Sequence, residues 1–182
     1  MPAGLHRFTF GDVLRMAEVG ILEESEHVEL LDGVLCTVTR EGPSHATLSV
    51  VVGDALRKVY GQGAHLRSHT NVHLDDYDAP ELDVAVVRGP ATDYFERLPS
   101  GADLVLVVEV SVTSQQRDRG KAHTYARHGV PEYWLLDVPA RELAVHRRPM
   151  QDGYMDVRTL TPDDEVELPE ADVRWRVGVL LG

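Results

Sequence analysis

Residues 104–110 read Leu-Val-Leu-Val-Val-Glu-Val, an apolar run interrupted only by the carboxylate of Glu109. A strand without polar alternation is typical of the centre of a sheet that is covered on both faces. Segments with helical periodicity alternate with further strand-like segments on both sides of this run. We therefore expect an α/β fold in which helices flank a mixed β-sheet.

Helix signals mark three segments, over residues 9–20, 44–60 and 117–128. The second is the clearest, because its apolar residues recur every three or four positions and form one stripe. Ser44 is its expected N-cap, and Thr9 with Asp12 has the pattern of a capping box for the first helix.

Strand signals fill most of the remaining chain. Asp32-Gly33 lies between two β-rich runs within residues 27–38 and favours a tight hairpin. Further strands are expected over residues 65–74, 82–87, 104–110, 132–137, 141–147, 154–160 and 173–180.

The composition is that of a globular protein of 182 residues, and we expect one domain over residues 1–182, with residues 1–8 as a candidate loose segment. We see neither a secretory signal nor a membrane-spanning run, and Cys36 has no cysteine to pair with, so we expect a cytoplasmic protein without membrane contact. The net charge of −12 argues against a broadly basic nucleic-acid surface and leaves room only for local contacts with DNA.

Two carboxylates interrupt apolar strands, Asp83 in residues 82–87 and Glu109 in residues 104–110. A buried, ionised carboxylate needs a cation, a hydrogen-bonding partner or a raised pKa. Acids on neighbouring strands can share a Mg²⁺ ion through their oxygens. The alternatives are pairing with an arginine or lysine, or exposure at the ends of the sheet.

Lys121 supplies a cation on the helix that follows the Glu109 strand. Asp118, Lys121, Ala122 and Tyr125 fall at three- and four-residue spacings and share one helix face. Ala122 suggests that this face points inward, where the amine could orient a water or neutralise an oxyanion. The alternative is an exposed lysine that pairs with Asp118 on the same helix.

An ordered set of short segments extends these signals over residues 8–181. The set comprises residues 29–33 (Glu-Leu-Leu-Asp-Gly), Ser44-His45, residues 80–87 (Pro-Glu-Leu-Asp-Val-Ala-Val-Val), residues 107–110, residues 118–121 (Asp-Arg-Gly-Lys) and residues 125–134. In order and spacing, the set resembles the Uma-two family of restriction endonucleases, within the PD-(D/E)XK nuclease superfamily.

The resemblance implies a restriction-endonuclease-like fold and assigns a role to several residues. Asp83 and Glu109 would be the catalytic motif acids and metal ligands, Glu29 a further metal ligand, and Lys121 the catalytic lysine, displaced onto the helix. His45, Asp118 and Tyr125 would support the site, and the metal would be Mg²⁺ or Mn²⁺. The chain departs from the family in having Leu82 where a proline precedes the aspartate, and in an Asp118–Lys121 spacing that is one residue short.

Other residue patterns in the sequence give weaker indications of a functional site. His65, His69 and His73 recur every fourth residue, but on a strand such residues lie too far apart to share one zinc ion. Residues 75–78 and 163–165 are acidic and read as solvated loops. We find no nucleophile elbow and no phosphate-binding glycine loop.

Three functional hypotheses follow. The first is a divalent-metal-dependent DNA endonuclease. The second is an inactive nuclease fold that works as a binding or assembly module, through a protein partner or as a homodimer, which the negative charge and the short Asp118–Lys121 spacing favour. The third is a hydrolase of another phosphorylated substrate.

Overall fold

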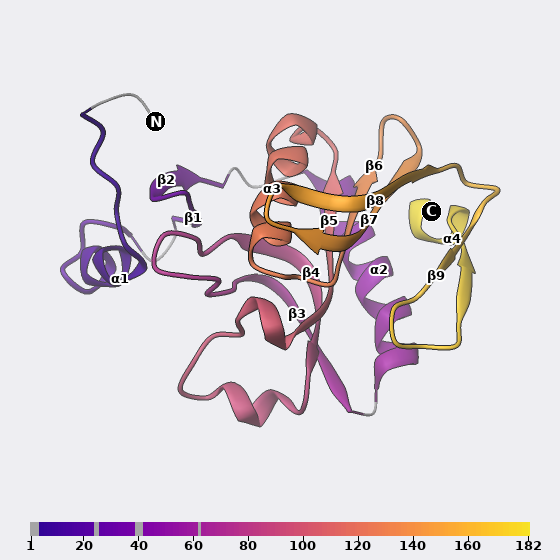
Figure 1. The fold of residues 1–182 in the computed structure, drawn as a ribbon, viewed down its shortest axis with the longest axis horizontal. Coiled ribbons are helices and arrows are strands. Elements are labelled where there is room, and N and C mark those ends of the chain that lie inside the picture. Colours follow the sequence, from indigo (N-terminus) through magenta and orange to yellow (C-terminus); the bar gives the residue numbers. More distant parts are fainter. Residues whose placement is uncertain (1–3, 24–25, 39–41, 62) are drawn as a thin grey trace.

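A six-stranded mixed sheet forms the centre of the molecule in the computed structural model, which describes residues 4–23, 26–38, 42–61 and 63–182 (Figure 1). Its strand order is β3-β4-β5-β6-β7-β8. The strands are β3 (Ala64–Asn71), β4 (Glu81–Arg88), β5 (Leu104–Ser111), β6 (Glu132–Asp137), β7 (Glu142–Met150) and β8 (Gly153–Leu160). Only β5 and β6 run parallel, and their connection is the crossover helix α3 (Gln115–Arg127).

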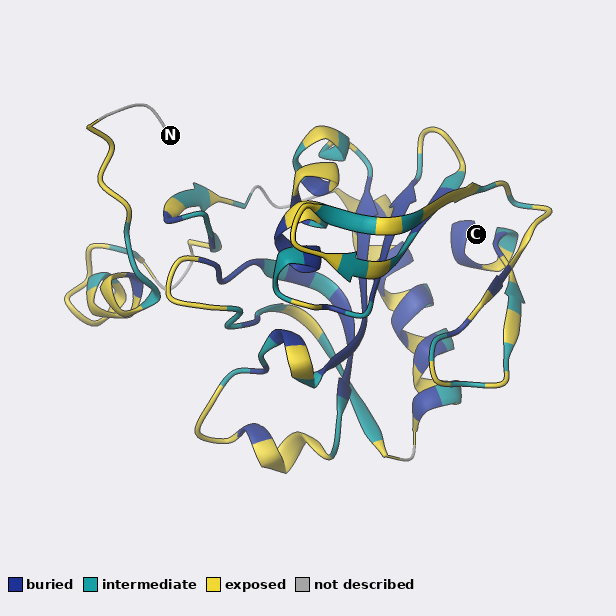
Figure 2. Cartoon of the chain, viewed as in Figure 1, coloured by how far each residue is buried: buried dark blue, intermediate teal, exposed yellow. Residues whose placement is uncertain are grey.

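Helices cover the two faces of this sheet. On one face, α2 (Pro43–Tyr60) and the C-terminal α4 (Gly178–Leu181) pack on a core that includes Leu56, Val86 and Trp134. On the other face, Tyr125 of α3 packs in a second core. Every residue of β5 is buried, as the run at 104–110 predicts, and Figure 2 shows the central strands in dark blue.

The N-terminal part forms a smaller unit beside the sheet. It contains α1 (Phe10–Glu18) and the hairpin of β1 (Val28–Leu31) and β2 (Val34–Thr37), around a small core of Val13, Leu30 and Ala79. The predicted capping box at Thr9 and the Asp32-Gly33 turn, with positive φ at both residues, are confirmed. Of the segment 1–8, residues 1–3 lie outside the described residues, and the Phe8 amide donates to the Gly33 carbonyl at 2.9 Å.

Three local expectations are wrong. The N-cap of α2 is Gly42 rather than Ser44, because Pro43 occupies the first helical position. The segment 173–180 is not one strand: β10 (Arg174–Arg176) pairs with β9 (Glu165–Glu167), and the chain then turns into α4, which buries Leu180 and Leu181. Asp78 is not solvated, since it is 1% exposed.

Two short 3-10 helices, at Ala91–Tyr94 and Gly101–Asp103, lie between β4 and β5. Within the described part of the chain, no helix has the length and apolar character needed to cross a bilayer.

Candidate active site

Asp83 and Glu109 lie side by side on the antiparallel strands β4 and β5. The register pairs Val84 with Val108, and one further step places Asp83 opposite Glu109. The Val110 amide donates to Asp83 Oδ2 at 2.7 Å, so β5 also fixes the orientation of the aspartate. The sheet therefore brings together two carboxylates that are distant in sequence.

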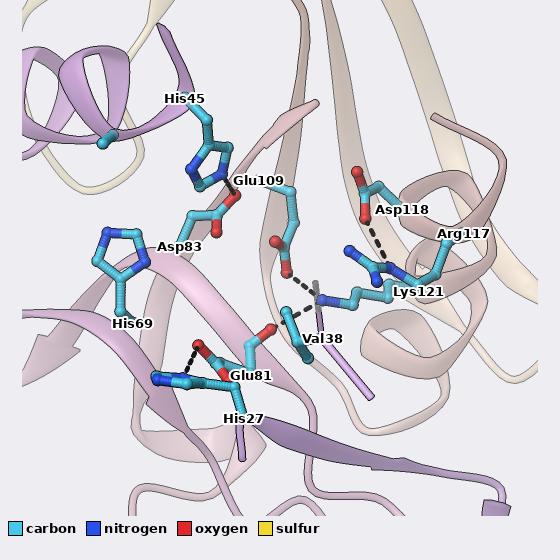
Figure 3. Close-up of a pocket in the computed structure, with 11 residues that line it drawn as sticks. His27, Val38, His45, His69, Glu81, Asp83, Glu109, Arg117, Asp118 and Lys121 are labelled. Atoms are coloured by element: carbon cyan, nitrogen blue, oxygen red, sulfur yellow. Dashed lines mark hydrogen bonds and ion pairs between the residues drawn. The ribbon is translucent and has the colours of Figure 1, made fainter. Parts of the chain in front are cut away.

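Lys121 reaches the same place from α3, as its predicted helix face requires. Its Nζ lies 3.2 Å from Glu109 Oε1 and donates to the Glu81 carbonyl at 2.8 Å. The residue is 3% exposed, so the alternative of a solvent-exposed lysine is excluded. Asp83, Glu109 and Lys121 thus converge on one point, as the sequence predicts (Figure 3).

Glu29 approaches this cluster from the N-terminal hairpin. Its Oε2 lies 2.8 Å from Lys121 Nζ and its Oε1 lies 3.6 Å from Arg117 Nε, while the residue itself is fully buried. A buried carboxylate at this place is stabilised by the two cations beside it. In this geometry Glu29 holds the ammonium of Lys121; that it also binds a metal stays a prediction.

The three supporting residues also lie at the cluster. The Tyr125 hydroxyl donates to Glu109 Oε1 at 2.8 Å, and His45 Nε2 lies 3.0 Å from Asp83 Oδ2. Asp118 is 2% exposed and accepts a hydrogen bond from Ser114. Each contact fixes one rotamer, which gives the site a defined geometry.

The ionisation of the cluster follows from burial and charge. Burial opposes the charge of Asp83, but the hydrogen bond and charge of His45 and the Val110 amide outweigh it and lower the pKa of Asp83. Burial raises the pKa of Glu109 well above its usual value, against the attraction of Lys121. Burial would lower the pKa of Lys121, but Glu109 and Glu29 raise it, so the amine stays charged at neutral pH.

A pocket of about 270 Å³ opens onto the cluster. Its lining is His27, Val38, His45, Ala46, His69, Glu81, Asp83, Glu109, Arg117, Asp118 and Lys121. Arg117 carries no role in the sequence analysis, although it lies four positions before Lys121 and so on the same helix face. His69 is bracketed by the pairs Ser68–Val84 and Thr70–Leu82, which places it opposite Asp83 in a left-handed conformation with φ of 49°.

The donors of this site fit a hard divalent cation. Asp83 uses Oδ2 for the Val110 and His45 contacts, and Glu109 uses Oε1 for Lys121 and Tyr125. Asp83 Oδ1 and Glu109 Oε2 take part in none of these four contacts. Carboxylate oxygens are the ligands that Mg²⁺ and Mn²⁺ prefer, and the carboxylates at the site outnumber its permanent cations, Arg117 and Lys121.

A second acidic group lies at the N-terminal side of the sheet. Oxygens of Asp75 and Asp78 and a ring nitrogen of His128 lie within 4.8 Å of one another. However, Arg127 donates to Asp78 Oδ2 at 2.6 Å and the Asp32 amide donates to Asp78 Oδ1 at 2.9 Å. A permanent cation therefore already neutralises this carboxylate, and we interpret the cluster as structural.

Comparison with known protein families shows which family this chain belongs to. Residues 10–177 match the family Uma2, described as "Putative restriction endonuclease". The chain belongs to the Uma2 family. Membership in this family supports a nuclease function, which is the general class of activity expected from the sequence.

A solved structure has the same fold as this Uma2 chain. It is the crystal structure of "a putative nuclease belonging to DUF820" from Anabaena variabilis ATCC 29413. The comparison has a TM-score of 0.76 and 16% sequence identity, and it covers 96% of this chain and 97% of that one. The likeness confirms the mixed sheet flanked by helices. Comparison with curated proteins gives no significant match.

Proposed function

We propose that this Uma2 protein is a divalent-metal-dependent DNA endonuclease with Asp83, Glu109 and Lys121 as its catalytic residues. The observation that carries the proposal is the 3.2 Å distance between Lys121 Nζ and Glu109 Oε1, which line a pocket together with Asp83. At this distance the amine and the carboxylate can act on the same water molecule.

Asp83 and Glu109 would hold Mg²⁺ or Mn²⁺, with Glu29 as the predicted third acid. When bound, such an ion lowers the pKa of a coordinated water and stabilises charge on a phosphoryl oxygen. His45 and the Val110 amide keep Asp83 ionised and oriented. The hydrogen bond from Tyr125 orients Glu109.

Lys121 would act as a charged donor rather than as a base. Its ammonium has no lone pair with which to take a proton from water, and the acids around it keep it in that form. It can orient a water through a hydrogen bond and stabilise the negative charge that develops on phosphate.

The substrate that we propose is DNA, bound by local contacts. The chain carries a net charge of −12, so binding would depend on a few groups at the pocket, of which Arg117 is the permanent cation nearest to the surface, at 30% side-chain exposure. We also propose that the enzyme works as a homodimer. Support comes from the edge strand β8, whose outer side has no strand partner among the described residues.

Cleavage of supercoiled, linear and single-stranded DNA, with Mg²⁺ or Mn²⁺, tests this function. We expect Asp83→Asn, Glu109→Gln and Lys121→Met to abolish cleavage. Asp163→Asn, at an exposed position, and Lys58→Met, at the chain's other lysine, are matched controls that should retain it. Cleavage that persists in the three site variants would refute the assignment.

The competing function is an inactive nuclease fold that binds a partner, which the net negative charge favours. Calorimetry with Mn²⁺ distinguishes the two. An active site of this kind should bind the ion in the wild type and lose it in Asp83→Asn, whereas an inactive site should give no heat of binding in either.

A further inference from the structure

β8 forms one edge of the six-stranded sheet, and its outer side has no partner among the strands of the described residues. Such an edge offers a row of unpaired backbone N–H and C=O groups. Proteins commonly protect exposed edges with proline, lysine or a local distortion. β8 contains neither proline nor lysine, and its charges Asp156 and Arg158 pair with each other. Its pairing with β7 is continuous from Asp156 to Leu160, and the left-handed Arg148 of β7 interrupts the ladder only opposite Met155.

The opposite edge of the sheet differs. β3 carries the left-handed residue His69, and the side chain of its last residue, Asn71, donates to the Val28 carbonyl of the N-terminal hairpin. This edge is therefore distorted and partly covered. β8 lies against α3, but Met155, Val157 and Thr159 stay exposed, so β8 is the edge more open to another chain.

Exposed apolar side chains lie on β8. Met155 is 64% exposed and Val157 is 53% exposed. Together with Thr159 they occupy alternate positions and so share one face of the strand. Exposed apolar residues on an unprotected edge are typical of a surface that another strand covers.

The charged residues of β8 indicate which strand could pair with this edge. Asp156 and Arg158 flank Val157, and within the chain their side chains form a bidentate pair, with Arg158 Nε 3.0 Å from Asp156 Oδ1. If β8 pairs antiparallel with its own copy about a two-fold axis at Val157, Asp156 lies opposite the second copy's Arg158, and Arg158 opposite the second copy's Asp156. The same register places Met155 opposite Thr159 and Val157 opposite itself.

We propose that two copies of this chain associate through β8 and form one continuous antiparallel sheet with its two-fold axis at Val157. Opposite charges directly across the strands stabilise this register, whereas a shift by two residues would separate them. The inference deepens the homodimer of the proposed function, but it depends only on the sheet edge. A chain without nuclease activity would leave it intact.

Cysteine crosslinking tests the register. In a Cys36→Ser background, Val157→Cys places two thiols opposite each other at the axis, within the distance that a disulfide spans. Thr159→Cys is the matched control, because its thiol lies opposite Met155 and roughly 13 Å along the strand from its own copy. Both positions are exposed, so neither substitution disturbs the core.

We expect mild oxidation to link Val157→Cys into a dimer and to leave Thr159→Cys monomeric on a denaturing gel. A wild-type chain that sediments as a monomer at every concentration would overturn both the interface and the homodimer. A wild-type dimer in which the two variants crosslink equally, or neither does, would overturn the β8 interface alone.

A charge exchange tests the pairing independently by sedimentation equilibrium. Asp156→Arg or Arg158→Asp alone replaces two attractive pairs with two repulsive ones, and we expect each to weaken dimerisation on the order of tenfold. The double variant Asp156→Arg/Arg158→Asp restores both pairs and should dimerise like the wild type. Glu18→Arg, the same charge change on exposed α1, should have no effect. A double variant as weak as either single one would contradict the proposed register.

Discussion

Replacing Lys121 with methionine should destabilise the fold as well as abolish activity. Methionine keeps most of the apolar length of lysine but removes the charge that serves Glu29 and Glu109, whose oxygens lie 2.8 Å and 3.2 Å from Nζ. Glu29 is fully buried and Glu109 is 2% exposed, so the loss of the ammonium leaves buried carboxylates without their counter-charge.

The expected loss follows from the cost of leaving a buried charge unpaired. Removal of one partner from a buried ion pair costs about 3–5 kcal/mol. Two carboxylates lose their cation here, but Arg117 remains near Glu29, and Tyr125 still donates to Glu109. We therefore expect a free energy of unfolding that is about 3 kcal/mol lower at neutral pH.

Urea unfolding followed by circular dichroism measures this loss. The double variant Lys121→Met/Glu29→Gln should recover part of it, because a neutral amide needs no counter-charge, and the coupling between the two sites should exceed about 1 kcal/mol. The loss should also shrink as the pH falls, since Glu109, whose pKa is raised by burial, no longer needs the amine once it is protonated. Lys58→Met is the control and should change stability by less than about 0.5 kcal/mol.

A loss below about 1 kcal/mol at neutral pH, or strictly additive effects of the two substitutions, would contradict this prediction. Either result would mean that Lys121 does not neutralise the buried acids.

Three further predictions test the surroundings of the site. Tyr125→Phe removes the donor to Glu109 and should weaken Mn²⁺ binding in calorimetry roughly tenfold, at a cost of about 1 kcal/mol in stability. Asp78→Ala leaves Arg127 and His128 without their buried carboxylate, so urea unfolding should show a loss of about 3 kcal/mol while the Mn²⁺ affinity stays unchanged. Burial lowers the pKa of His146 below its ordinary value of 6.5. The contribution of the neutral ring to stability is therefore present above pH 6.5 and is lost as the pH falls through the folded-state pKa. His146→Phe should reduce the dependence of the urea midpoint on pH across that range.

Local patterns predicted most of the fold. The apolar stripe of α2, the Asp32-Gly33 hairpin and the buried run of β5 each depend on neighbours in sequence, and the structure confirms them. The C-terminal helix α4 was missed because it has four residues, too few for helical periodicity to stand out from a strand.

Part of the site could be inferred from the sequence, and part depends on long-range packing. Carboxylates within apolar strands pointed to Asp83 and Glu109, whereas Lys121 was assigned by the family resemblance, because the helix face alone favoured an exposed lysine. Residue patterns alone could not show that Glu29 places an oxygen 2.8 Å from that amine, because the contact joins the N-terminal hairpin to α3. The burial of Asp78 was missed for the same reason, since its partner Arg127 lies at the end of α3.

Anomalous diffraction from a crystal soaked in Mn²⁺ would show whether Asp83, Glu109 and Lys121 converge on one cation site. We predict one strong peak at roughly 2 Å from oxygens of both Asp83 and Glu109. A peak at Asp75, Asp78 and His128 instead, or none at Asp83 and Glu109, would contradict the account.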